Sequence, residues 1–249
     1  MNFNRLIQRL HLKPLGEWVL GLKRARKYIH GYGVEIGALH KPFKLTGLPV
    51  SKISYVDRMT NEDLRKQYPE LNDLDLVEVD IVDDGSTLSR IPDESLDFII
   101  ANNLIEHLQN PIKTLENWHR KLRPGGIIYL AVPDKRYTFD IDRKITTIHH
   151  LVEDYRAGDE EIIRRNYSHF VETAEIIEKR TGKDAQDRVN DLISRNYSIH
   201  FHAWDFRSFK KFLGYIITEM KIQYTIVDHV ISTPLTKEFV FILGKPISK

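Results

Sequence analysis

The chain has 249 residues, of which 41% are hydrophobic and 29% charged, and it contains no cysteine. This length suits one domain with an elaboration, or two small ones, and the missing cysteines exclude disulfide bonds and thiolate metal sites. The formal net charge is only +2. A nucleic-acid-binding domain normally carries a basic stripe, so we expect no nucleic-acid partner.

Residues 1–30 have the pattern of an amphipathic helical extension. Basic side chains interrupt its apolar positions, as at Arg5, Arg9 and Lys13, so no apolar run is long enough for a signal peptide or a membrane span. We predict a helical cap packed on the domain rather than a helix lying on a membrane surface, and we expect a cytoplasmic protein.

The first indication of a ligand site lies in residues 33–40. An apolar run carrying Glu35 ends at Gly37, the pattern of a buried strand followed by a tight turn where backbone approaches a ligand. Prolines follow, so we predict a loop there and not a helix. A second strand ends at Asp57, twenty positions after Gly37. An acid at that offset accepts hydrogen bonds from ribose hydroxyls in doubly wound folds.

Further strands are separated by intervals long enough for helices, which indicates a parallel α/β sheet. We predict these strands at 75–80, 96–102 and 127–132. Asp80 and Asn102 end the first two of them. Because the carboxyl ends of parallel strands line the ligand crevice, these polar residues are expected to share a rim with Asp57.

The pattern changes after the fifth strand. No strand is predicted from 134 to 205; helices are predicted instead, at 147–156, 160–179 and 184–195. An insertion at the carboxyl end of a strand lies over the ligand rim, so we predict a substrate lid.

The chain ends with a helix after Asp205 and two strands, 223–229 and 238–244, joined by a connection too short for a crossover. The two strands must therefore be antiparallel. The predicted organisation is a single domain, with a cofactor-binding core formed by 31–133 and 206–249.

Taken together, these features resemble class I S-adenosylmethionine-dependent methyltransferases. The resemblance rests on the acid-bearing strand before Gly37, the acid ending strand two, the Pro124-Gly125-Gly126 turn before strand five and the antiparallel final pair. The segment from Glu106-His107-Leu108 to Pro111 is similar to an element of the type 11-like subgroup. The resemblance implies a Rossmann-like, seven-stranded, mostly parallel sheet with an antiparallel C-terminal hairpin.

The resemblance also implies S-adenosylmethionine as the cofactor and assigns its binding residues. Glu35, Gly37 and the backbone of Ala38 would hold the methionine end, Asp57 the ribose, Asp80 and Ile81 the adenine, and Asn102 would lie beside the sulfonium. The glycine-rich turn of the family is reduced here to Gly37. A cofactor without a pyrophosphate needs no helix N-terminus for phosphate, so this departure disfavours an NAD-dependent oxidoreductase.

Three lid segments, 132–140, 146–150 and 200–204, are similar to segments of bacterial methyltransferases associated with polysaccharide and sugar biosynthesis. That likeness implies O-methylation of a sugar, nucleotide-sugar or glycan hydroxyl. The alternatives are N-methylation of an amino sugar or small metabolite, and a non-catalytic scaffold that binds the cofactor. The sequence leaves a homodimer open.

Methylation of a hydroxyl requires a proton acceptor near neutral pKa. The candidates for catalysis are His107, Asp134 and His200, and those for acceptor binding are Arg136, Tyr137, His149, His202 and Trp204. Each has a structural alternative. His107 could bond to backbone, the aromatic side chains could form the core of the lid, and Arg136 and Arg143 could pair with Asp140 and Asp142 instead of clamping a phosphate.

A divalent metal is a further alternative, bound by His200 and His202 together with Asp134 or Asp205. Two histidines one residue apart are weak evidence for a metal. We predict structural hydrogen bonding for these histidines and no metal site.

Overall fold

The structure is a computed structural model that describes residues 27–247. Most of the predicted helical cap, residues 1–30, falls outside the described residues. Among the described residues, no helix has the length and apolar character needed to cross a membrane.

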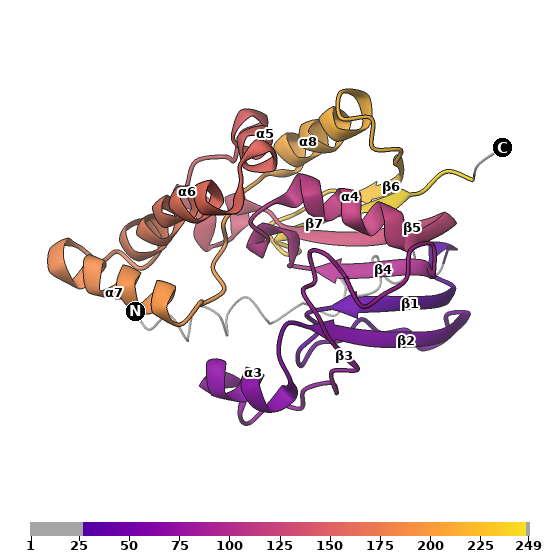
Figure 1. Cartoon of the computed structure of the whole chain (residues 1–249), viewed down its shortest axis with the longest axis horizontal. Helices are drawn as coiled ribbons and strands as arrows, with labels where there is room; N and C mark the ends of the chain where they lie inside the picture. Colours follow the sequence, from indigo (N-terminus) through magenta and orange to yellow (C-terminus); the bar gives the residue numbers. More distant parts are fainter. Residues whose placement is uncertain (1–26, 248–249) are drawn as a thin grey trace.

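The core is one seven-stranded sheet (Figure 1). Its strands are β1 (Gly31–Ile36), β2 (Val50–Asp57), β3 (Ile81–Val82), β4 (Leu96–Asn102), β5 (Leu122–Pro133), β6 (Thr225–Val230) and β7 (Glu238–Gly244). They are ordered β3-β2-β1-β4-β5-β7-β6. Strands β1 to β5 are parallel, and β7 runs antiparallel to both of its neighbours. The predicted α/β fold with an antiparallel C-terminal hairpin is confirmed.

The predicted third strand at 75–80 is wrong. Only Ile81 and Val82 pair with β2. The reason is that the Tyr55 N–H donates to the Asp80 carboxylate (2.7 Å) and not to a main-chain carbonyl, while the Asp80 N–H donates to the Tyr55 carbonyl (2.9 Å). A side chain thus occupies the edge of β2, and the ladder begins one residue later.

Both faces of the sheet are buried, as a parallel sheet requires. Side chains alternate between the faces. One set packs under helices α4 (Pro111–Lys121), α5 (Ile148–Arg156) and α8 (Phe206–Thr218). It includes Val34, Ile36, Ile99, Ala101, Ile128, Leu130 and Val132. The other set includes Phe98, Ile100, Tyr129, Ala131, Val240 and Ile242, and packs against residues 28–29 and the loop after β1. That loop, which carries Phe43, stands where many such folds have a helix, as the prolines predict.

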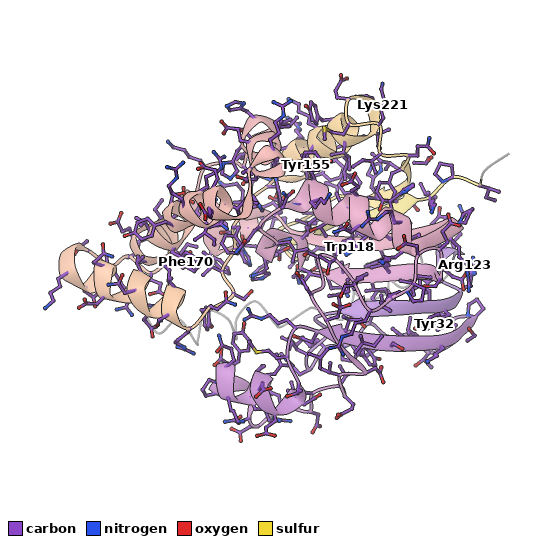
Figure 2. The ribbon with its side chains drawn as sticks, in the orientation of Figure 1. Tyr32, Trp118, Arg123, Tyr155, Phe170 and Lys221 are labelled. Atoms are coloured by element: carbon purple, nitrogen blue, oxygen red, sulfur yellow. The ribbon has the colours of Figure 1, made fainter. Side chains whose placement is uncertain are left out.

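Helix α4 (Pro111–Lys121) begins after Asn110, because the Asn110 side chain accepts a hydrogen bond from the Lys113 N–H (3.0 Å) and Pro111 is the first helical residue. Trp118, labelled near the centre of Figure 2, is fully buried beneath this helix. Its indole N–H donates to the Gly85 carbonyl (2.7 Å). This bond fixes α4 to the loop after β3.

The remaining helices are α3 (Asn61–Gln67), α5 (Ile148–Arg156), α6 (Asp159–Glu172), α7 (Gly182–Ser194) and α8 (Phe206–Thr218), with a π-helical turn at Thr173–Ile177. Figure 1 shows α6 and α7 beyond the carboxyl ends of the parallel strands, at the same end of the molecule as α3. Helices therefore fill the insertion after β5, close to their predicted places.

The insertion also contacts the segments that follow β2, near the other edge of the sheet. The Gln67 amide at the end of α3 donates to the Arg195 carbonyl (2.8 Å), and the Arg195 guanidinium donates back to the Gln67 carbonyl (3.0 Å). Arg58, just after β2, donates to the Asn196 carbonyl (3.1 Å). The insertion thus starts beside β5 and reaches across to the segment after β2.

Candidate functional site

The strand order reverses at β1, which lies between β2 and β4. In open α/β sheets, ligands bind outside the carboxyl ends of the strands at this point. Gly37 follows β1 here with φ +68°, a conformation that glycine adopts without cost. A Cβ on Gly37 would lie 3.6 Å from Leu104, which follows β4. The turn after β1 therefore faces the segment after β4.

Two more predicted cofactor residues meet at this turn. Glu35 is 1% exposed, and its carboxylate accepts hydrogen bonds from the Phe43 N–H (2.9 and 3.0 Å) and from the Asn102 side chain (3.3 Å). Ala38 accepts the Lys41 N–H through its carbonyl (3.0 Å), which closes the turn. The structure thus brings Glu35, Gly37, Ala38 and Asn102 together.

Of the predicted ribose and adenine residues, Asp57 and Ile81 lie on neighbouring strands. Asp57 ends β2 and pairs in register with Val82, while Ile81 pairs with Val56. Asp80 precedes β3, and its carboxylate accepts the Tyr55 N–H (2.7 Å). Burial raises the pKa of Asp57, and hydrogen bonds from the backbone N–H groups of Arg58 and Met59 oppose this rise. A carboxylate at the end of β2 is suited to accept hydrogen bonds from hydroxyl groups, as a ribose would offer.

A second group of polar residues lies just beyond Asn102. A short 3-10 helix, Ile105–His107, carries Glu106 and His107. The chain segment between α7 and α8 comes back over it, because the N–H groups of Phe201 and His202 both donate to the Glu106 carbonyl (2.8 and 3.2 Å). This places His200 beside the short helix.

We call Glu106, His107 and His200 the Glu–His cluster. The Nε2 atoms of His107 and His200 lie 4.0 and 3.9 Å from Oε1 of Glu106. The two imidazole rings meet edge to face with their centroids 4.5 Å apart. Two sequence-predicted catalytic residues are thus brought together around an acid that the sequence analysis did not select.

Hydrogen bonds orient both imidazoles. His200 Nδ1 lies 2.7 Å from the Asp140 carboxylate, which also accepts from Arg143 (3.0 Å). His107 Nδ1 lies 2.9 Å from the Ile199 carbonyl. Because each Nδ1 carries the proton that satisfies its acceptor, each Nε2 is directed to Glu106.

The cluster has perturbed protonation. Burial raises the pKa of Glu106 to about 7, although the charge of His200 opposes this. Burial lowers the pKa of His107 to about 3, and the charge of His200 adds to this effect. Burial would lower the pKa of His200 as well, but the charge and hydrogen bond of Asp140 outweigh it and raise that pKa. Perturbed groups of this kind gather at functional sites.

Asp134, the third predicted catalytic residue, lies apart from the cluster in an ion pair. It is fully buried, and it accepts hydrogen bonds from Arg136 (2.8 and 2.9 Å) and from the Ser232 hydroxyl (2.5 Å). Burial alone would raise the pKa of Asp134, but these hydrogen bonds hold it below its usual value. A carboxylate so stabilised is a weak proton acceptor.

The predicted acceptor-binding residues separate into three groups. Arg136 and Tyr137 lie directly after β5, with the guanidinium 5.1 Å from the Tyr137 ring centroid. His149 is 83% exposed on α5 and pairs with Glu153. His202 and Trp204 are each 1% exposed and stack on one another in the core, so neither ring has an exposed face to offer a sugar.

The metal ligand set considered from the sequence is not assembled. His200 contacts Asp140, whereas His202 packs against His150 and His169. Asp205 caps α8 by accepting the Ser208 N–H (2.7 Å). Arg143 forms ion pairs and is not placed to clamp a phosphate, because its buried guanidinium bonds to Asp140 and to Glu172.

Glu106 and Asp140 are not among the catalytic or acceptor-binding residues predicted from the sequence. The sequence offered one sign for Glu106, which directly precedes His107 and follows the apolar pair Leu104-Ile105. Asp140 was considered only as a partner of Arg143. The contact that gives it a place in the site, to His200, joins residues far apart in the chain.

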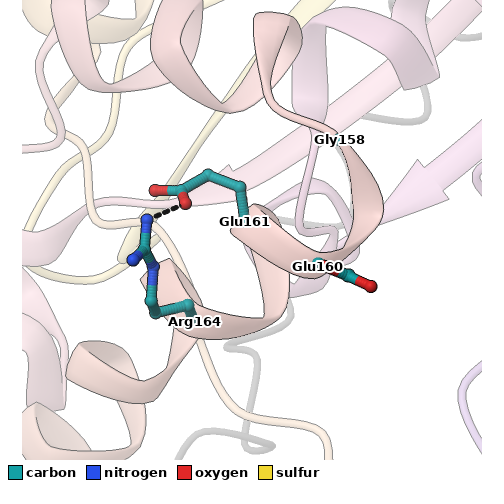
Figure 3. A pocket seen from close by; sticks show the side chains of 4 residues that line it. All are labelled: Gly158, Glu160, Glu161 and Arg164. Atoms are coloured by element: carbon teal, nitrogen blue, oxygen red, sulfur yellow. Dashed lines mark hydrogen bonds and ion pairs between the residues drawn. The ribbon is translucent and has the colours of Figure 1, made fainter.

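A surface hollow on α6 is separate from these groups. Gly158, Glu160, Glu161 and Arg164 line it, and Glu161 pairs with Arg164 (Figure 3). It contains none of the predicted site residues and is built from one helix, so it is a feature of the outer surface.

A model of the methyltransferase domain family matches residues 15–174 of this chain. The comparison with curated proteins finds no match. Among solved structures, a Rhodobacter sphaeroides protein described as a putative zinc-dependent alcohol dehydrogenase aligns at 13% identity and a TM-score of 0.51, covering 94% of this chain and 91% of that one. At this identity the likeness concerns the fold alone.

A putative methyltransferase from Bacillus halodurans aligns at 12% identity and a TM-score of 0.49, covering 93% of this chain and 99% of that one. The chain spans only 54% of the CurJ carbon methyltransferase structure and 47% of the citrinin polyketide synthase methyltransferase domain that it also matches. The family match covers more than half of the chain. The chain therefore belongs to the methyltransferase domain family.

Proposed function

We propose that this methyltransferase methylates a hydroxyl group of a sugar, nucleotide-sugar or glycan. The observation that carries the proposal is the Glu–His cluster, which lies at the carboxyl end of β4 next to the cofactor crevice. A hydroxyl must lose its proton to become a methyl acceptor, and a buried acid flanked by two oriented imidazoles suits that task.

Four residues hold the cofactor in this proposal. Glu35 binds the ammonium of the methionine end, and Asp57 binds the ribose hydroxyls. Gly37 has no side chain, so it leaves room beside the turn for the methionine part of the cofactor. Asn102 lies between Glu35 and the cluster, since its amide donates to Glu35 (3.3 Å) and β4 ends there. When bound, the cofactor supplies an electrophilic methyl group on its sulfonium.

The chain's own residues align the acceptor and move its proton. The acceptor oxygen lies against the Glu–His cluster, and its proton passes to a carboxylate oxygen of Glu106 and from there to solvent. The new O–CH₃ bond forms as the S–CH₃ bond breaks. The charge of Asp140 favours the protonated form of His200, whose Nε2–H stabilises the negative charge that develops on the acceptor oxygen.

The helical insertion, residues 134–205, serves as the acceptor lid in this proposal. Its return segment covers the cluster, and its contacts with Gln67 and Arg58 span the crevice. Excluding water in this way protects the methyl donor from hydrolysis. The resemblance of three lid segments to methyltransferases of sugar and polysaccharide biosynthesis supports the acceptor class. Arg136 and Tyr137, at the start of the lid, are proposed to contact the acceptor.

A panel of acceptors tests the proposal. Nucleotide sugars bearing free hydroxyls, their deoxy analogues and their amino analogues are incubated with the enzyme and S-adenosylmethionine, and mass spectrometry records methyl addition. We expect methylation of a hydroxyl sugar and none of its deoxy analogue. Methylation confined to the amino sugars would contradict the proposal in favour of N-methylation.

The variant Glu106→Gln assigns the chemistry to the cluster. It should lower kcat by about 10²- to 10⁴-fold, the usual contribution of a positioned proton acceptor, with unchanged binding of S-adenosylhomocysteine. Glu160→Gln, on the outer surface of α6, is the matched control and should retain full activity. Equal activity in both variants would remove the cluster from the reaction.

A further inference from the structure

Glu106 is a buried carboxylate, and no side chain of another described residue lies within hydrogen-bonding distance of its oxygens. Its side chain is 1% exposed, and neither carboxylate oxygen accepts a hydrogen bond from another described residue. Burial of an acid in this state is unfavourable unless a cation or a donor reaches it. The two imidazole Nε2 atoms nearby stop at 3.9 and 4.0 Å, which leaves a gap between the three groups.

The gap has the dimensions of an ion site. One ligand atom each from Glu106, His107 and His200 lies within 4.8 Å of the others. Metal–ligand bonds of about 2.0–2.1 Å place tetrahedral ligands roughly 3.3 Å apart. A cation between the three groups would therefore need each of them to move by less than about 1 Å.

The groups behind the imidazoles are those that metal-binding histidines use. His200 donates its Nδ1–H to the Asp140 carboxylate, and His107 donates its own to the Ile199 carbonyl. Such bonds fix the tautomer with Nε2 unprotonated and hold the ring in place. Asp140 is itself fixed by the buried guanidinium of Arg143.

We propose that the Glu–His cluster binds one divalent transition-metal ion of the zinc type. Two imidazole nitrogens and one carboxylate oxygen suit Zn²⁺ or Co²⁺ better than Mg²⁺ or Ca²⁺, which prefer all-oxygen sites. Three protein ligands leave at least one coordination position open, as in catalytic metal sites. The site stands on its own geometry, whereas its use in catalysis rests on the proposed function.

The open position has a role in that function. An acceptor hydroxyl bound to the ion becomes more acidic and is held in place for attack. The proton leaves to the second oxygen of Glu106, since only one oxygen is needed as a ligand. The product is the methyl ether, and the ion keeps its charge throughout.

Direct titration tests the site without any acceptor. The full-length protein is treated with a chelator, dialysed and titrated with Co²⁺, whose visible absorption reports nitrogen coordination, and then with Zn²⁺ in competition. We expect one Zn²⁺ per chain to displace the Co²⁺ signal. Absence of a visible band at saturating Co²⁺, or binding of Mg²⁺ in preference to Zn²⁺, would overturn the proposal.

Three variants locate the ion. Glu106→Gln should raise the Kd for Zn²⁺ by at least about a hundredfold, and Asp140→Asn, which acts through His200, by about 10- to 100-fold. His149→Gln, an exposed histidine of α5, is the control and should bind Zn²⁺ as the parent does. Cooperative thermal unfolding and binding of S-adenosylhomocysteine show that each variant is folded. Undiminished Zn²⁺ binding by Glu106→Gln would overturn the proposal.

The failure of this inference differs from the failure of the proposed function. Hydroxyl methylation by chelator-treated enzyme at the full rate would overturn the role of the ion in catalysis and leave the function standing. Stoichiometric Zn²⁺ binding that Glu106→Gln abolishes, with no hydroxyl acceptor methylated in the presence of the ion, would support the site and contradict the function.

Discussion

At the scale of single residues, two of the buried acids of this molecule, Asp134 and Glu106, have opposite surroundings. Asp134 is surrounded by donors, whereas Glu106 has none from another described residue. The first arrangement favours a stable fold. The second costs stability and is characteristic of a functional group.

Replacing Glu106 by Gln should therefore stabilise the chelator-treated protein, although it lowers activity. The amide occupies the same volume and removes a buried carboxylate without a hydrogen-bonding partner, which is worth about 1–2 kcal/mol. For a domain of this size, the unfolding midpoint should rise by about 2–8 °C. Thermal unfolding in chelator measures this. A lower midpoint in the variant would show that Glu106 contributes favourably to the fold.

Asp134→Asn should have the opposite effect. The folded-state pKa of Asp134 lies below its unfolded value, so its ionised form stabilises the protein at neutral pH, and this contribution is lost as pH falls below about 4. We expect a loss of about 1–2 kcal/mol at pH 7, reduced because the side chain of Arg136 is 45% exposed. The difference in the free energy of unfolding between Asp134→Asn and the parent should become smaller toward pH 3.

Urea unfolding at pH 7 and pH 3 measures the difference. Asp142→Asn is the matched control, since this exposed acid pairs with Lys179 on the surface, and it should leave the free energy of unfolding unchanged. If the free energy of unfolding of Asp134→Asn were below that of the parent by the same amount at both pH values, the charge of Asp134 would not be the cause.

At the scale of secondary-structure elements, Asn110 performs two tasks. Its side-chain oxygen caps α4, and its amide donates to the Asp154 carbonyl of α5 (3.0 Å). Asn110→Ala should cost about 1–2 kcal/mol, the range for a lost cap with an added inter-helix bond. Asn110→Asp, which keeps the cap alone, should recover part of the loss in urea unfolding. Equal losses in the two variants would show that the cap contributes nothing.

Elements were predictable where local sequence sets them. The strands at 96–102 and 238–244 lie at the predicted residues, because apolar runs define them. The third strand was not predictable, since the side chain of Asp80 takes the N–H of Tyr55. Hydrophobic pattern alone does not show which partner an edge strand finds.

The residues of the candidate site were likewise predictable only in part. Glu35, Gly37 and Asn102 follow from strand ends, which topology places side by side. The Glu–His cluster depends on the segment between α7 and α8, which the helical insertion brings back to Glu106. His202 and Trp204 lie in the same segment but pack into the core. Spacing along the chain cannot distinguish these two outcomes.

At the scale of the whole molecule, we expect the crevice at β1 to bind S-adenosylmethionine. Thermal unfolding of the full-length protein with S-adenosylmethionine, S-adenosylhomocysteine or NAD tests it most directly. A ligand at a hundred times its Kd adds about 2.7 kcal/mol, which should raise the unfolding midpoint by about 5–10 °C. We predict this rise with the two adenosyl ligands and not with NAD, and its loss in Asp57→Asn. No shift with either adenosyl ligand, or a shift with NAD alone, would contradict the account.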